Sequence, residues 1–129
     1  MLDEKLRAEM EAVIARMEGL EARIEEIERR GIEPLKASME RIKALSDGDE
    51  SLMSMWKENG LAIMDSLGRL EESIAQTRER FGEIRELIEG IRSEKYPPDV
   101  WQEESDKINR IMEAVEADVA QMAEIFSLI

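Results

Sequence analysis

Three stripes of apolar residues run along the chain, each at alternating spacings of three and four residues. They extend from Leu6 to Ile27, from Trp56 to Ile91 and from Trp101 to Ile129. This spacing turns one narrow face of a helix toward a neighbour, and a stripe that persists over several heptads is typical of coiled-coil packing. The pattern predicts an all-α antiparallel helical bundle with coiled-coil packing and three long helices.

The first helix is expected to run from about Asp3 to Arg30 and to be kinked near Gly31-Pro34. Proline lacks the backbone N–H that an interior helical position needs, so Pro34 favours a kink or break. Beyond it, helical spacing resumes one residue out of phase with the first stripe. The resumed positions are Ile32, Leu35, Met39 and Ile42.

Turn-forming residues set the ends of the other two helices. The polar segment 46–51 predicts a turn, and Asp49 or Ser51 is expected to cap a very long helix over residues 52–94. Two consecutive prolines then end that helix. Asp99, with a glutamine three residues later, predicts a capping-box start for the last helix.

The chain, residues 1–129, is expected to form a single helical-bundle domain whose helices cover one another unequally. Short connections make neighbouring helices antiparallel. Residues 3–30, 65–95 and 100–129 should therefore pack as a three-helix part. The first two predicted helices continue past the end of the third, so residues 35–64 are predicted to form a two-helix hairpin extension.

The hairpin extension has no third helix to cover its apolar stripes, and four of the nine methionines lie in it. Flexible thioether side chains suit a surface that accepts a partner helix, and the C-terminal residues spread apolar groups beyond one stripe. The alternative is that these methionines are core residues and that the C-terminal end plugs the base of the extension near Pro34. The predicted partner-binding residues are Met39, Ile42, Met53, Met55, Trp56, Gly60, Met64, Ile125, Phe126, Leu128 and Ile129.

Four glycines interrupt the predicted long helix, and each costs about 1 kcal/mol relative to alanine. Gly60 lies in the stripe, where a missing side chain leaves room for a bulky neighbour. Gly68 and Gly82 lie off the stripe. They are either tolerated surface glycines or part of a second contact face that allows close helix approach.

An excess of acidic residues limits the kinds of partner. The chain has 31 acidic and 18 basic residues and a formal net charge of −13, so it repels phosphate backbones and anionic membrane surfaces. Nucleic acid is not an expected partner, and no apolar run is long enough for membrane insertion. A cytoplasmic location is expected because the charged start does not resemble a secretory signal. Export by a specialised secretion machine stays open.

The residue types that usually carry catalysis or bind metals are absent or dispersed. The chain has no histidine and no cysteine, which removes the usual nucleophile–histidine pairs and the imidazole or thiolate ligands of zinc. Its carboxylates fall at positions expected to face solvent, outside any dry cleft suited to acid–base chemistry. No enzyme activity, metal, cofactor or small-molecule substrate is expected.

The spacing of Ile74, Phe81, Ile84 and Ile88 resembles that of the packing helices in bacterial chemoreceptor signalling bundles. The resemblance is confined to this heptad pattern, because the chain lacks the distinctive hairpin-tip motif of that family. It implies helix packing and assigns no family.

These patterns favour a non-enzymatic interaction protein, either an adaptor or a chaperone-like chain. It would self-associate, as a homodimer or other homo-oligomer, or bind a partner's amphipathic helix. Two hairpin extensions packed together would close both stripes as a four-helix bundle. The alternative is a structural subunit whose helical hairpins stack into a filament or larger assembly.

Overall fold

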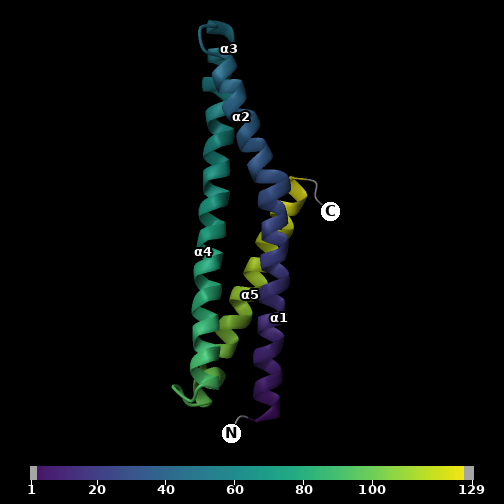
Figure 1. Cartoon of the computed structure of the whole chain (residues 1–129), viewed down its shortest axis with the longest axis vertical. Coiled ribbons are helices and arrows are strands. Elements are labelled where there is room, and N and C mark those ends of the chain that lie inside the picture. The colour runs from purple at the N-terminus through teal and green to yellow at the C-terminus, as the bar shows by residue number, and fades with distance from the viewer. Residues whose placement is uncertain (1–2, 127–129) are drawn as a thin grey trace.

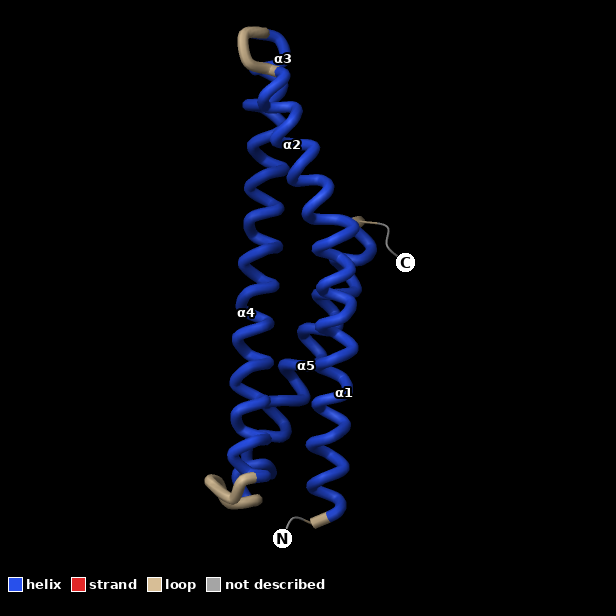
Figure 2. The backbone as a smooth tube through the Cα atoms, viewed as in Figure 1, coloured by secondary structure: helices blue, strands red, loops and turns tan. Residues whose placement is uncertain are grey.

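The computed structural model describes residues 3–126, and every regular element among them is a helix. In chain order the elements are α1 (Glu4–Ile27), the π-helix η1 (Glu28–Ile32), α2 (Glu33–Leu45), α3 (Glu50–Met55), the π-helix η2 (Trp56–Gly60), α4 (Leu61–Arg92) and α5 (Asp99–Ile125). Figures 1 and 2 show them in one elongated arrangement, with α4 running along most of its length. The prediction of an all-helical chain is confirmed.

The predicted count of three long helices, the first of them kinked, is not matched. The first predicted helix consists of α1, η1 and α2, which together we call the first arm. The second consists of α3, η2 and α4, which we call the second arm. Each is divided by a π-helical turn of five residues rather than by a loop. The second arm also begins and ends two residues earlier than expected, at Glu50 and Arg92.

Each π-helical turn accommodates one residue more than the α-helical turn it replaces. In η1 the amide of Glu33 donates to the carbonyl of Glu28, five residues before it, and η2 closes with a bond of the same kind. The buried residues Ile27 and Ile32 are therefore five positions apart and still lie on the same side of the arm. This turn is the physical reason for the one-residue change of phase in the apolar spacing.

The expected kink near Gly31-Pro34 takes the form of this π-helical turn. The backbone stays in the right-handed helical region at Ile32 and Glu33. Pro34 is the second residue of α2, and because it has no N–H it donates no hydrogen bond to the helical turn before it. Figure 1 shows α2 leaning toward α4 from this junction. The first arm thus changes direction without leaving the helical conformation.

Ion pairs between the two arms show the same additional residue. Three pairs connect the first arm to α4: Glu21–Arg85, Glu28–Arg78 and Lys36–Glu71. Between the first two pairs both arms advance by seven residues. Between the second and third pairs α4 again advances by seven residues, whereas the first arm advances by eight. The additional residue falls in the segment that contains η1.

The hydrophobic core lies between α1, α4 and α5, which all contact one another. Successive stripe positions supply its side chains, and the fully enclosed ones include Met10, Met17, Phe81, Met112 and Val119. Aliphatic and thioether groups fill most of this core, because only 4% of the chain is aromatic. Burial of these side chains is the main favourable term that holds the three helices together.

The helix starts agree with the predicted capping at one turn and not at the other. Asp49 accepts hydrogen bonds from the amides of Ser51 and Leu52 at 3.0 and 3.2 Å, so it caps α3. At α5 the capping position is Pro98, and no side chain caps the helix. The capping box predicted at Asp99 is therefore wrong. Proline suits a helix start because its fixed φ matches the first turn.

The third helix ends before the two arms do. At the end of α5, Phe126 packs over η1, where a Cβ atom on Gly31 would lie only 2.6 Å from the aromatic ring. Beyond this level α2, α3, η2 and the first turns of α4 continue as a hairpin to the tip of the molecule (Figure 1). The absent side chain of Gly31 thus fixes where α5 meets the base of the hairpin extension.

Candidate interaction surface

Exposed large apolar side chains concentrate in the hairpin extension. Among the described residues eight such side chains are exposed, and six of them lie in this segment. The six are Ile42, Leu45, Leu52, Met55, Leu61 and Ile63. Leu45 is the most exposed at 74%, and Ile125 at the end of α5 is 60% exposed. A single exposed leucine is ordinary, whereas a concentration of apolar groups marks an interaction site.

A groove at the base of the hairpin extension has an apolar lining without a charged residue. It has a volume of about 280 Å³. Its lining residues are Leu35, Ala62, Ile63, Ser66, Leu67, Leu70, Ile125 and Phe126. The groove therefore lies where α2, α4 and the end of α5 meet. In a chain of which 38% is charged, depletion of charge is the compositional feature of an interface core.

Helical spacing continues this apolar lining from the groove to the tip. On α2, Ile42 and Leu45 follow the groove residue Leu35 by seven and ten positions, so they lie on the same side of the helix. On the other arm Met55 precedes the groove residue Ile63 by eight positions, which is two turns when one of them is π-helical. We name this surface the uncovered face, and its residues are Leu35, Ile42, Leu45, Met55 and Ile63.

Three of the predicted partner-binding residues are buried inside the hairpin itself: Met39, Trp56 and Gly60. The indole of Trp56 is 6% exposed and lies over Gly60, where an added Cβ atom would be 2.3 Å from the ring. The room predicted beside Gly60 is thus filled by a side chain of the same arm. These residues hold the two arms together and present no free surface in the single chain.

The other predicted residues lie closer to the surface. Three are exposed: Ile42, Met55 and Ile125. Three are half-buried: Met53, Met64 and Phe126. Leu128 and Ile129 lie outside the described residues. The half-buried ring of Phe126 also lines the groove, so the end of α5 closes the lower end of the uncovered face.

The predicted partner-binding residues do not include Leu45, Leu52 and Ile63, although all three are exposed. All three are apolar residues at helical spacings, and spacing alone does not distinguish a stripe that is covered from one that is not. The useful signal for Leu45 is its place in the last turn of a helix beyond the end of the third stripe. A covering helix would have to extend that far to bury it.

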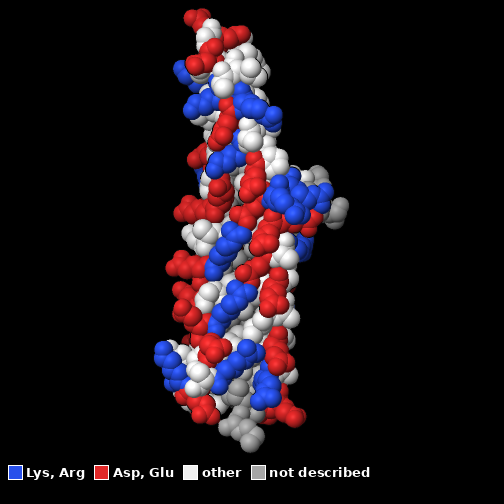
Figure 3. Space-filling model, in the orientation of Figure 1, with Lys and Arg blue, Asp and Glu red and all other residues white. Residues whose placement is uncertain are grey.

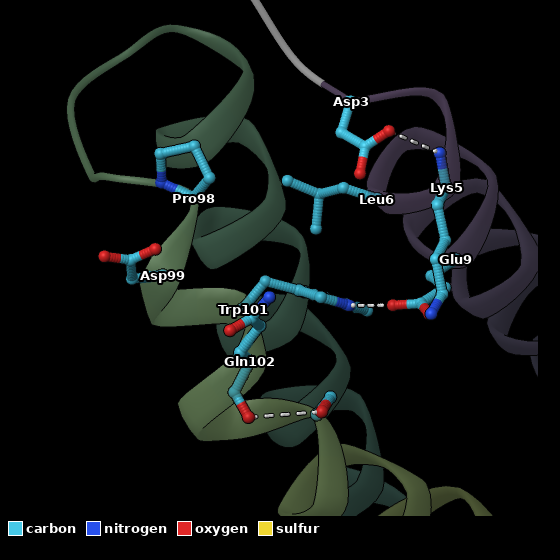
Figure 4. A pocket seen from close by; sticks show the side chains of 9 residues that line it. Asp3, Lys5, Leu6, Glu9, Pro98, Asp99, Trp101 and Gln102 are labelled. Atoms are coloured by element: carbon cyan, nitrogen blue, oxygen red, sulfur yellow. Dashed lines mark hydrogen bonds between the residues drawn. The ribbon is translucent and has the colours of Figure 1, made fainter.

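A second hollow, of about 340 Å³, lies at the opposite end of the molecule between the starts of α1 and α5 (Figure 4). The indole Nε1 of Trp101 donates a hydrogen bond of 2.9 Å to a carboxylate oxygen of Glu9 there. Asp3, Lys5 and Asp99 complete a polar lining. Because the buried indole N–H already has its partner and the charges are of both signs, this hollow does not select one kind of ligand.

Charged side chains of both signs alternate over the face of the molecule that Figure 3 shows. Hydrogen bonding to Glu28 raises the pKa of Arg78, and hydrogen bonding to Glu21 raises the pKa of Arg85. Arginine is already charged at neutral pH, so these shifts change no protonation state there. Because the paired side chains are partly exposed, each pair contributes at most about 1 kcal/mol. They set the register of the arms more than they stabilise them.

Within residues 3–126 no three acidic side chains converge closely enough to hold a metal ion. None of the helices described is both long and apolar enough to span a membrane. Comparison of the chain with protein-family models, with curated proteins and with solved structures gives no match. The all-helical fold therefore defines the class of the protein, and the uncovered face is its strongest candidate for a functional site.

Proposed function

We propose that this protein is a non-enzymatic helical interaction protein, adaptor or chaperone-like in kind. Its hairpin extension self-associates or accepts a partner's amphipathic helix. The observation that carries the proposal is the uncovered face, where apolar side chains continue past the end of α5 with a charge-free groove at their base. In the same proposal α1, α5 and the part of α4 that follows Met64 pack as an antiparallel coiled coil, and the hairpin extension is its open end.

Energetics supports contact with another protein surface. Fully burying one large aliphatic side chain is worth about 1.5–3 kcal/mol. Ile42, Leu45, Met55 and Ile63 retain roughly half of that surface in water, so covering each of them contributes about 1 kcal/mol. An amphipathic helix laid along the uncovered face supplies such cover by the helix-in-groove mode of recognition.

The second candidate is a structural subunit of a filament or larger assembly. Leu61 favours it, because this residue is half exposed and lies two positions from Ile63, on the other side of α4. An open assembly needs two different contact surfaces on each subunit. Leu61 is a single exposed residue outside the uncovered face, whereas the uncovered face has several. A complex that covers only the uncovered face, which we call the closed complex, therefore buries most of the exposed apolar surface.

A photo-crosslinking amino acid introduced in place of Leu45 tests the proposal in living cells. The matched control carries the same group in place of Leu61. We expect a discrete crosslinked product from position 45 and little or none from position 61. A product of twice the chain mass identifies self-association, and another discrete mass identifies a different protein. Absence of a product at position 45 would contradict the proposed function.

Light scattering after size exclusion, over a concentration series, separates the closed complex from the filament. A closed homo-oligomer reaches a constant mass as concentration rises, whereas a filament continues to grow. To test whether the uncovered face forms the interface, the same measurement is made on Leu45→Glu rather than on a substitution of Trp56. Trp56 is buried within the hairpin, and a charge there would disrupt the fold as well as any interface.

A further inference from the structure

We infer that the hairpin extension pairs with the hairpin extension of a second copy of this chain in antiparallel orientation. Leu45 at the tip of each copy enters the groove at the base of the other. This inference rests on the proposed function, which it sharpens by naming the partner and the orientation. Shape and charge support it independently.

Each copy carries both a projecting side chain and a hollow on its uncovered face. Leu45, the most exposed large apolar residue described, lies at the tip. The groove begins at Leu35, ten residues earlier on α2, which places the two about 15 Å apart along the helix. A two-fold axis midway between them, perpendicular to α2, puts each Leu45 at the partner's groove. One rotation thus makes both contacts, as an isologous interface requires.

The groove has the size and polarity for this occupant. A cavity of about 150 Å³ accommodates a benzene molecule, so the groove of about 280 Å³ has room for Leu45 and a neighbouring apolar side chain. Leu52 is the nearest exposed candidate across the tip turn. Because the lining is uncharged, two copies of net charge −13 can approach there without placing like charges in contact.

Charge at the two ends decides between antiparallel and parallel pairing. The tip turn carries three exposed acidic residues, Asp47, Asp49 and Glu50. Acidic side chains lie at this end of the molecule in Figure 3. At the base, Arg29 of η1 lies among Glu25, Glu26, Glu28 and Glu33, and Arg30 is already paired with Glu26. Parallel pairing would place two acidic tips together, which like-charge repulsion opposes. Antiparallel pairing places the two acidic tips at opposite ends of the interface and so avoids this repulsion.

Cysteine crosslinking reports the orientation directly, because the chain has no native cysteine. The full-length Leu45→Cys and Ile63→Cys variants, distinguishable by an affinity tag on one of them, are mixed and treated with a short bis-maleimide. Antiparallel pairing gives mostly the mixed product between the two variants. Parallel pairing gives mostly Leu45→Cys linked to itself. Leu61→Cys, on the other side of α4, replaces Ile63→Cys in the matched control and should give little mixed product.

The Leu45→Glu variant measures how much the contact contributes. Because the two-fold axis repeats the substitution, we expect the dimer dissociation constant to rise about a hundredfold. Leu61→Glu should change it less than about threefold. Both side chains are exposed in the single chain, so the helical circular dichroism signal should remain.

Two results would overturn the inference. One is a wild-type chain that stays monomeric in light scattering at every concentration, and the other is self-crosslinking of Leu45→Cys as the main product. Neither result decides the proposed function. That function depends on a crosslink at position 45 in cells, which a different partner protein would also give.

Discussion

Gly60 and Gly68 form a matched pair for testing how the hairpin extension is packed. Both are glycines of the second arm, but their surroundings differ. A Cβ atom on Gly60 would lie 2.3–2.8 Å from three atoms of the Trp56 indole, whereas a Cβ atom on Gly68 would meet nothing within 4 Å. The variants Gly60→Ala and Gly68→Ala therefore add the same methyl group to a filled and to an open site.

The expected free energies of unfolding follow from two opposing effects. Alanine is favoured over glycine in a helix by about 1 kcal/mol, so Gly68→Ala should stabilise the protein by about that amount. Gly60→Ala has the same gain, but it displaces a ring that is 6% exposed, and overpacking costs about 1–3 kcal/mol. The net expectation for Gly60→Ala is a loss of about 1 kcal/mol, and the two variants should differ by about 2 kcal/mol.

Urea unfolding followed by circular dichroism at one protein concentration measures this difference. With an m-value of about 2 kcal/mol per molar, the midpoints of the two variants should lie about 1 M apart. A Trp101→Phe background isolates the fluorescence of Trp56, which should shift to the red only in Gly60→Ala. Equal stabilisation by both alanines, with no spectral change, would refute the packing of Trp56 over Gly60.

Two further substitutions test the ends of the long helices. Glu94 adopts a positive φ of 64° just after α4, and this conformation costs a non-glycine residue about 1–2 kcal/mol. Glycine avoids this cost but loses more conformational entropy on folding. Glu94→Gly should therefore raise the free energy of unfolding by about 0.5–1 kcal/mol. Glu94→Ala, which keeps the strain, should not. In the hollow between the starts of α1 and α5, Glu9→Ala leaves the buried N–H of Trp101 without its acceptor. This substitution should lower the free energy of unfolding in urea by about 1–3 kcal/mol. Glu9→Gln keeps an acceptor, and an equal loss from it would show that the hydrogen bond contributes little.

The apolar spacing was sufficient to predict most of the helical content and the turns. Buried residues such as Met10, Ile24, Phe81 and Met112 are those that the stripes select, because helix packing repeats one simple period. The Asp49 cap was also predictable, since a short polar side chain before a helix has few other roles. The Asp99 cap was not, because Pro98 can start a helix by its φ alone.

The candidate surface was predictable only in part. Ile42, Met55 and Ile125 are exposed, whereas Met39 and Trp56 are buried. The difference depends on how far α5 extends and on how the two arms rotate about one another, and this rotation depends on the π-helical turns. Spacing showed the change of phase near Pro34 but gave no means of telling a π-helical turn from a break. A residue's place in a stripe thus predicts the side of the helix on which it lies, without saying whether another helix covers that side.

The π-helical turn η1 has a consequence for chain length in evolution. A helix that is fixed on both sides by core packing can accept a one-residue insertion only by forming such a turn, because any other response would rotate one side out of its partner. Loss of Pro34, which lies between Glu28 and Lys36, would allow an uninterrupted α-helix and would restore a seven-residue step between the ion pairs that now frame it. The base of the hairpin extension is therefore a place where related chains can gain or lose one residue and keep the fold.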